Sequence, residues 1–314
     1  MRNFKLTVAY DGTDYFGWQE QADKVSIQET IEAAIAQITG QKVRLSASGR
    51  TDTGVHALGQ VAAFRVETLL TPEVLQKAMN AVLPEDIAVL DVCEVPADFH
   101  PRYSAKRKHY RYLIYDGQVR DIFMRRYAWH YKKGRLDADA MHRAAQSLLG
   151  THDFTSFESS GAKRKTSVRT IFSLEVRRGR AGQGGDSANA PSFSRERAPT
   201  EGWSASVLKG EGGRGKGVAP LSQNLSLWNA TPVPFPSTAT NPSDWITLDI
   251  IANGFLYNMV RAILGTLVEV GRGVRPESWP GEVLRAADRR RAGPTAPPQG
   301  LFLVNVSYAE DAYH

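Results

Sequence analysis

The chain has 314 residues, of which 42% are hydrophobic and 23% charged, a composition typical of folded globular proteins that excludes a disordered chain. No stretch reaches the ~18 consecutive apolar residues of a membrane helix, and the N-terminus lacks a signal-peptide core, so we expect a cytoplasmic protein without a membrane partner. The single cysteine, Cys93, excludes an intrachain disulfide and a multi-thiolate metal site, and its apolar neighbours predict a small core residue.

The positive charge is concentrated in one segment. The net charge is +6, but residues 101–180 hold 19 Lys and Arg against 7 Asp and Glu, whereas residues 1–100 hold 8 against 14. Such a segment predicts a basic face that binds a polyanion, and nucleic acid is favoured over an anionic membrane because no amphipathic anchor helix is evident. Charge alone leaves a solvated basic surface without a ligand as the alternative.

The first hundred residues predict the element order β-α-β-β-α-β. Hydrophobic alternation predicts strands at 4–10, 42–47, 59–66 and 87–94. Helical spacing predicts helices at 26–39, where Ser26 and Glu29 form a capping box, and at 71–82, where Thr71 and Pro72 mark the start.

The rest of the chain repeats this order. Strands are predicted at 106–115, 170–177, 244–253 and 301–308, and helices at 137–149 and 255–271. The doubled order predicts an α+β fold of two ferredoxin-like (split β-α-β) halves, 1–103 and 104–314, each with its helices on one sheet face. Residues 179–243 are rich in Gly, Ser, Pro and Ala without a sustained period, which predicts a low-complexity, disordered insertion.

A short connection between two predicted strands carries unusual polar chemistry. In "SGRTDTGVHA" the glycines predict a turn that displays Asp52, with Arg50 and His56 close enough in sequence to supply a cation and a hydrogen-bond partner. A turn in which Asp52 only bonds its own backbone is the alternative. A metal site is disfavoured because a lone Asp and His give no convincing ligand spacing.

The stretch "GRTDTGVHALGQVAAF" closely resembles the catalytic signature of the tRNA pseudouridine synthase A family. The resemblance extends to "AYDGTDYFGWQEQ", "FHPRYSAKRKHYRYLIY", "HDFTSF", "ANGFLYNMVRAILGTLVEVGRG" and "QGLFLVNVSY", and covers nearly the whole chain outside 179–243. Several ordered motifs at compatible spacing make a coincidental match improbable.

This resemblance implies an isomerase that converts uridine to pseudouridine at positions 38–40 in the anticodon stem-loop of tRNA. It implies a homodimer without metal or organic cofactor, and two α/β halves around a central antiparallel sheet with an electropositive active-site cleft between them. The catalytic loop is 48–58. By motif, Asp52 is the nucleophile, Arg261 pairs with it, Arg50 helps the base leave its stack, and Tyr110 stacks beside the reacting uracil.

The reaction exchanges a C1′–N1 bond for a C1′–C5 bond, so no redox cofactor is needed. Asp52 could attack C1′, abstract a ribose proton to give a glycal, or attack C6, and we favour glycosidic cleavage. Tyr110 and a recycled Asp52 are both candidates for removing the C5 proton. Strand alternation places Tyr110 and Tyr112 on one face, where a ring can stack on a flipped base or simply pack in the sheet.

Two groups of cations are predicted to follow the RNA backbone. These are Arg102, Lys106, Arg107 and Lys108, and a second set of Lys163, Arg164 and Lys165. The main alternative is a non-catalytic RNA-binding protein built from doubled RRM-like units, but no clear RRM aromatic signature is present. A nucleotide-processing enzyme is disfavoured because neither a Walker loop nor a dinucleotide fingerprint appears.

Overall fold

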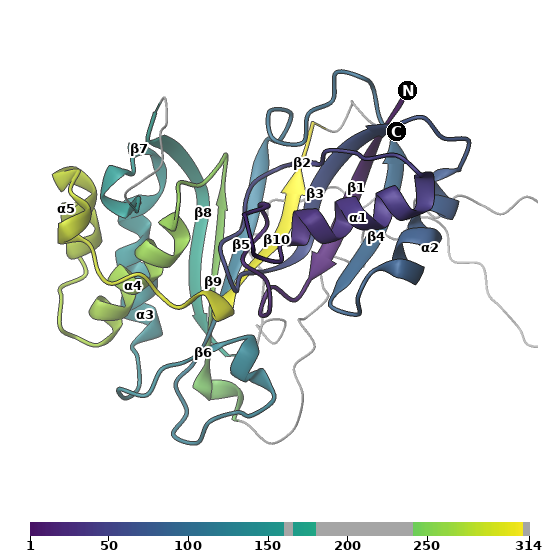
Figure 1. The fold of residues 1–314 in the computed structure, drawn as a ribbon. Helices are drawn as coiled ribbons and strands as arrows, with labels where there is room; N and C mark the ends of the chain where they lie inside the picture. Colours follow the sequence, from purple (N-terminus) through teal and green to yellow (C-terminus); the bar gives the residue numbers. More distant parts are fainter. Residues whose placement is uncertain (160–165, 180–240, 310–314) are drawn as a thin grey trace, which may run out of the picture. The chain divides into compact units, whose positions relative to one another are not determined.

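The structure, a computed structural model, describes residues 1–159, 166–179 and 241–309, and all of these belong to one compact unit (Figure 1). The described strands are β1 (Arg2–Tyr10), β2 (Ser46–Ala47), β3 (His56–Val66), β4 (Ile87–Glu94), β5 (Arg107–Tyr115), β6 (Trp129–His130), β7 (Gly150–Asp153), β8 (Val168–Arg178), β9 (Trp245–Ala252) and β10 (Leu301–Ser307). The helices are α1 (Ile27–Thr39), α2 (Pro72–Val82), α3 (Ala138–Ala145), α4 (Met259–Gly271) and α5 (Trp279–Ala286).

One sheet in this part of the chain runs in the order β4-β1-β3-β10-β5-β9-β8-β7, with β2 beside β3 and β6 beside β5. The first half has the order β4-β1-β3-β2 and the second β10-β5-β9-β8, so each half is a split β-α-β unit. The predicted α+β fold class is therefore confirmed. Neighbouring strands are antiparallel except for β3–β10 and β5–β6. The parallel β3–β10 pair arises because the last strand of the second half adds to the edge of β3.

The helices cover the sheet in two groups (Figure 1). The strands of the first half carry α1 and α2, and those of the second carry α3, α4 and α5. The helix-facing residues of the strands are buried, among them Phe4, Leu6 and Val8 in β1 and Leu248 and Ile250 in β9. Cys93 is only partly buried and packs against a second, smaller apolar cluster.

Local sequence signals account for the helix starts. The Ser26 hydroxyl accepts a hydrogen bond from the Glu29 N–H (3.3 Å) at the start of α1, and Thr71 does the same for Val74 (3.4 Å) at the start of α2. Gly40, with φ of 69°, ends α1 in the left-handed conformation that glycine adopts without strain.

Several element boundaries differ from the prediction. Helix α4 begins at Met259 rather than residue 255, because Asn258 has a φ of 60° that interrupts a helix. Only residues 46–47 of the predicted strand 42–47 are paired, and β3 begins at His56 rather than residue 59, so the connection between β2 and β3 spans residues 48–55. The helix predicted to end at residue 149 ends at Ala145 and continues as a 3-10 turn over 146–148.

The division into halves at residue 103 stays a prediction. Residues 180–240, most of the predicted insertion, and the cations Lys163, Arg164 and Lys165 lie outside the described residues. No helix in the part of the chain that the structure describes is long and apolar enough to span a bilayer.

Candidate active site

The loop between β2 and β3 displays Asp52 on a tight turn. The Val55 N–H donates to the Asp52 carbonyl (3.1 Å), and Gly54, with φ of 74°, occupies the third position of the turn. A positive φ at this position is why the turn requires glycine. The hydrogen bond that the Asp52 carboxylate accepts comes from Arg261 and not from the backbone of its own loop.

Residues 10–18 of the N-terminal segment pack against this loop and form hydrogen bonds with Thr51. The Trp18 N–H donates to the Thr51 carbonyl (3.0 Å), and the Tyr10 and Thr51 hydroxyls are 2.8 Å apart. A Cβ on Gly17, where φ is 83°, would lie 2.7 Å from the Thr51 carbonyl oxygen, so only glycine permits this approach. The motif "YDGTDYFGW" thus serves as the support of the catalytic loop.

Arg261 lies beside Asp52, although 208 residues separate them in the chain. Its Nη1 is 3.4 Å from Asp52 Oδ2 and donates to Asn258 Oδ1 (2.8 Å), while its Nε donates to the Ala296 carbonyl (2.7 Å). The two side chains are only 24% (Asp52) and 15% (Arg261) exposed. The guanidinium is therefore held in place by two anchors besides the carboxylate.

Two opposing effects act on the pKa of Asp52. Burial raises it, and the attraction and hydrogen bond of Arg261 lower it, with the result that the pKa lies above its ordinary value. Arg261 limits the cost of ionising a half-buried carboxyl. A partly desolvated carboxylate with one cation is a better nucleophile or base than a fully hydrated one.

Tyr110 contributes an aromatic face to the same site. It is 8% exposed, and its ring meets Phe255 edge-on with centroids 5.0 Å apart. Burial and the nearby Tyr10 and Asp52 raise the pKa of Tyr110, so the hydroxyl stays protonated at neutral pH. Among the described residues this hydroxyl has no hydrogen-bond partner.

Arg50 and His56 were expected to lie near Asp52 because they belong to the same loop, but neither contacts it. Arg50 is exposed and forms no ion pair within the described residues. His56 is 1% exposed; its Nε2 faces the carbonyls of Arg126 (2.9 Å) and Gln299 (3.2 Å), and its Nδ1 is 3.1 Å from Asp11 Oδ1. His56 therefore anchors the end of the loop, and the partner of Asp52 is Arg261.

The four predicted backbone-binding cations do not form one cluster. Lys108 lies on the face of β5 that carries Tyr110 and donates to the Ser48 carbonyl in the catalytic loop. Arg107 lies on the opposite face, with its guanidinium 4.9 Å from the centre of the Phe172 ring. Arg102 and Lys106 are exposed in the segment before β5.

Sequence reasoning missed the segment at residues 293–300, which supports both halves of the site. Its carbonyls accept from Arg261 and from the Tyr112 hydroxyl (2.6 Å, at Pro297), and Pro298 lies against Gly54 of the loop. The segment crosses α4 at Gly265, where a Cβ would lie 1.6 Å from the Pro294 carbonyl oxygen. The segment shows no helical or strand period from which its position could be predicted. The glycine at position 265, inside a predicted helix, was the one signal that another backbone passes close to that helix.

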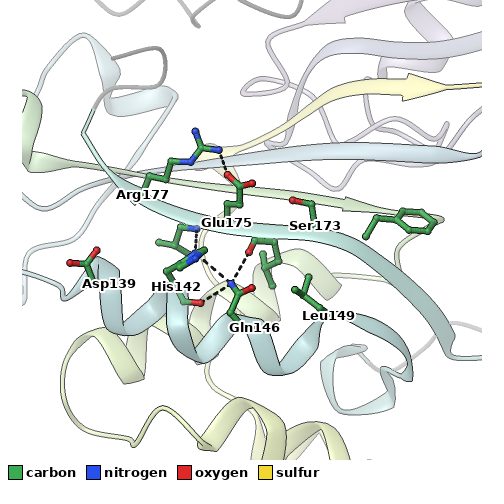
Figure 2. Close-up of a pocket in the computed structure, with 10 residues that line it drawn as sticks. Asp139, His142, Gln146, Leu149, Ser173, Glu175 and Arg177 are labelled. Carbon is green, nitrogen blue, oxygen red and sulfur yellow. Dashed lines mark hydrogen bonds and ion pairs between the residues drawn. The ribbon is translucent and has the colours of Figure 1, made fainter. Parts of the chain in front are cut away.

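The groove drawn in Figure 2 is not lined by Asp52, Arg261 or Tyr110. It has a volume of about 490 Å³ and runs between α3 and the edge of β8. Gln146 donates to the Leu174 carbonyl (3.2 Å) and His142 accepts from the Val176 N–H (3.3 Å), so α3 and the 3-10 turn that follows it satisfy backbone groups on the edge of the strand. None of the predicted site residues lines it, and we assign it a structural role.

The described residues contain no group of three or more His, Cys, Asp or Glu that could hold a metal ion. The charged groups at the site are the carboxylate of Asp52 and the guanidinium of Arg261, which form an ion pair.

Comparison with known proteins agrees with the motifs. A family model described as tRNA pseudouridine synthase matches residues 6–104 and 144–309. The chain is 37% identical over 308 residues to tRNA pseudouridine synthase A of Thermoanaerobacter sp. (strain X514), and 38% and 39% identical over 309 residues to the proteins of that name from Caldicellulosiruptor bescii and Geotalea uraniireducens. These alignments cover 98% of this chain and 100% of each relative. The chain belongs to the tRNA pseudouridine synthase family.

Proposed function

We propose that the protein isomerises uridine to pseudouridine in the anticodon stem-loop of tRNA, at positions 38–40, with Asp52 as the nucleophile. The observation that carries this proposal is the half-buried Asp52–Arg261 pair, whose carboxylate is near enough to Tyr110 to help raise the pKa of that tyrosine. A binding protein has no need of a carboxylate whose ionisation is costly, whereas a nucleophile needs one that is both desolvated and kept anionic. The pair therefore favours catalysis over the RRM-like alternative.

The bond changes define what the site must do. The C1′–N1 bond breaks, the uracil turns, a C1′–C5 bond forms, and the proton on C5 leaves while N1 gains one. Asp52 acts at the sugar of the extruded nucleotide, either on C1′ or on a ribose proton, and attack on C6 is a third route. Among these routes we favour glycosidic cleavage by action of Asp52 at the sugar.

Asp52 is also the better candidate for removing the C5 proton. Tyr110 would have to lose its own proton to act as a base, and its raised pKa opposes this. For Asp52, the Arg261 guanidinium favours the carboxylate form and opposes the effect of burial on its pKa. Tyr110 then serves as the aromatic surface against which the extruded base stacks.

Extruding a paired uridine costs a few kcal/mol, which contacts to the RNA must offset. Arg50, which is exposed, stands two residues before Asp52 in the chain and forms no ion pair within the described residues, is the residue we assign to the vacated position in the stack. We further propose that the protein acts as a homodimer in the cytoplasm, where its tRNA substrate is found.

The test is to incubate unmodified tRNA with the wild-type protein and with Asp52→Ala, and to map pseudouridine by position. We expect modification at positions 38–40 by the wild type, none by Asp52→Ala, and tRNA affinity within a few-fold of the wild type for that variant. Binding without any pseudouridine in the wild type would instead support the RNA-binding alternative.

A further inference from the structure

Four buried polar side chains connect the catalytic loop to β1 and β3. They are Ser48 and Thr51 from the loop, Gln60 from β3 and Tyr10 from the end of β1, and none of them is more than 6% exposed. Polar groups removed from water cost free energy unless they are hydrogen-bonded to one another. Apolar side chains of the same shape would fill this space at no greater cost, so a polar network next to Asp52 points to a role beyond packing.

Gln60 is the centre of this network. Its Oε1 accepts from the Ser48 hydroxyl (2.7 Å) and from the Val61 N–H (3.2 Å). Its Nε2 donates to the Gly49 carbonyl (2.9 Å) and lies 3.5 Å from the Tyr10 hydroxyl. A backbone N–H can only donate and a carbonyl can only accept, so these contacts determine which end of the amide carries the oxygen. Both ends of the amide are therefore used.

The network holds the backbone on both sides of Arg50. Gln60 fixes the carbonyl of Gly49, the residue before Arg50. The hydroxyl of Thr51, the residue after it, lies 2.8 Å from the tyrosine hydroxyl at the end of β1. Because Asp52 follows Thr51 directly, the same contacts fix the backbone from which the carboxylate projects.

The loop would not keep this geometry by itself. Residues 48–55 include Gly49 and Gly54, and glycine loses more conformational freedom on folding than any other residue. Hydrogen bonds shielded from water are electrostatically stronger than exposed ones, so the buried amide can restrict such a loop. Gln60 is also uncharged. It anchors the loop without altering the attraction between Asp52 and Arg261, which an ionised side chain in its place would do.

We propose that Gln60 is a positioning residue for pseudouridine formation, which holds the catalytic loop so that Arg50 and Asp52 are in place before the nucleotide arrives. This inference rests on the proposed function of Asp52. The contacts of the Gln60 amide do not include Asp52, so it acts through the loop backbone. A misplacement of about 1 Å at a reacting group can cost ~100-fold in rate. Loss of Gln60 should therefore slow the reaction more than it weakens tRNA binding.

The first test measures kcat and tRNA affinity for Gln60→Met and Gln60→Glu. Methionine removes every amide contact at similar volume, and an ionised glutamate keeps the shape but cannot donate to Gly49. For both variants we expect kcat to fall about 10- to 100-fold, and affinity for unmodified tRNA to stay within about threefold of the wild type. Assays are run below the melting temperature of each variant.

The matched control is Ser156→Ala, which removes another fully buried hydrogen-bonding group. The Ser156 hydroxyl donates to the Val283 carbonyl (2.5 Å) and accepts from the Asp288 N–H (2.9 Å), so its contacts lie at α5 and the residues after it. This substitution should lower the melting temperature and leave kcat at the wild-type value. It separates a general loss of stability from a loss of positioning.

The second test follows the loop itself, by amide hydrogen exchange in the free protein. The Ser48 and Val55 N–H groups each donate to a backbone carbonyl (2.8 and 3.1 Å). In Gln60→Met we expect these two amides to exchange about tenfold faster or more, while amides of β9, which report on unfolding of the core, keep wild-type rates. In Ser156→Ala the two loop amides should keep their protection.

Tyr10→Phe tests the network without changing Gln60. It removes the hydroxyl that lies between Gln60 and Thr51 and keeps the ring. We expect kcat to fall about three- to tenfold with little change in affinity, and the loss in the double variant with Gln60→Met to be smaller than the product of the two, because both changes release the same loop.

Two results would overturn the positioning role. One is a kcat loss in the Gln60 variants and in Tyr10→Phe that is no greater than that of Ser156→Ala. The other is wild-type exchange of the loop amides in Gln60→Met. A wild-type protein that forms no pseudouridine would contradict the proposed function instead, whereas faster loop exchange in Gln60→Met would still show that Gln60 holds the loop.

Discussion

At the scale of single residues, the proposed function depends on a carboxyl, that of Asp52, which lies where ionisation is costly. Burial raises the pKa of Asp52, and Arg261 opposes that effect from 3.4 Å away. Arg261 can do so because Asn258 and the Ala296 carbonyl orient it. The free-energy cost of burying a carboxylate at a functional site is commonly offset by stabilising interactions elsewhere in the fold.

Asp52→Asn should raise the thermal stability of the protein at pH 7. The folded-state pKa of Asp52 lies above its ordinary value of 3.8, so the unfolded state gives up this proton first and ionisation opposes folding at neutral pH. Below pH 3.8 the carboxyl is protonated in both states, and the advantage of Asn should vanish. Melting temperatures measured between pH 3 and pH 7 check this, with the exposed Asp98→Asn as control. A lower melting temperature for Asp52→Asn at pH 7 would mean that Arg261 outweighs burial.

Arg261→Gln should move the acid limb of the kcat/KM profile for tRNA to higher pH. The substitution removes the attraction that favours the carboxylate, so the pKa of Asp52 rises further and less nucleophile is present at a given pH. We expect turnover to fall about 100-fold or more at pH 7, and RNA affinity to fall less. Arg272→Gln, at the residue that caps the C-terminus of the same helix and pairs with Glu269, should leave the profile unchanged. An acid limb that stays in place would remove the pairing from the mechanism.

At the scale of elements, the site is assembled where the 293–300 segment crosses α4. The Gly293 N–H donates to the Thr266 hydroxyl (2.9 Å), and the Ala296 N–H donates to the Arg261 carbonyl (3.1 Å). Gly265 lets the backbone of the segment touch the helix. The same segment then supports Gly54 of the catalytic loop through Pro298, so one connection positions both partners of the ion pair.

Gly265→Ala should therefore impair both stability and turnover. The new methyl group would overlap the Pro294 carbonyl, so the segment must move away from α4 and take the Ala296 anchor of Arg261 with it. We expect a loss of about 1–3 kcal/mol, as in overpacked cores, measured by denaturant unfolding, together with a clear drop in kcat. Gly273→Ala, at a helix end with φ of 71° and open space around it, should cost about 1 kcal/mol and keep its turnover. Equal turnover in the two variants would show that the crossing does not position the site.

At the scale of the whole molecule, β10 joins the two halves of the sheet. It is the last strand of the second half and pairs in parallel with β3, which follows directly on the catalytic loop. Phe302 lies beside His56, so the strand that completes the second core also fixes the base of the loop. Together with the 293–300 segment that precedes it, β10 brings the half that carries Arg261 against the half that carries Asp52.

Leu303→Ala should destabilise the entire described unit in a single transition. Leu303 is 1% exposed and lies in the main core, and removing such a side chain costs about 2–5 kcal/mol. Asn305→Ala, on the exposed side of the same strand, should change stability by less than about 0.5 kcal/mol. Two separate transitions in Leu303→Ala, with only one shifted, would show that the halves unfold independently.

The predictions from sequence succeeded where a periodic pattern or a local cap specifies an element. The strands of both halves and the starts of α1 and α2 follow from alternation, helical spacing and the Ser26 and Thr71 caps. Helix α5 and the short strands β6 and β7 were missed because they contain too few residues to show a period. The start of α4 was misplaced because the left-handed Asn258 is held by Arg261, a contact made by the folded chain.

By itself the sequence determined the doubled β-α-β-β-α-β order, the glycine-bounded loop that carries Asp52, and the motifs that identify Asp52, Arg261 and Tyr110. Each of these features is encoded by residues that are close together in the chain, because hydrophobic periodicity and backbone conformational preferences are local properties of the sequence. The resemblance named Arg261 as the partner of Asp52, but only the tertiary structure decided how the two side chains meet, that Arg50 and His56 do not contact Asp52, and that Lys108 and Arg107 lie on opposite faces of β5 with different neighbours. The reason is that burial and the arrangement of charges arise from residues brought together by β10 and the 293–300 segment, and no local pattern encodes those distances.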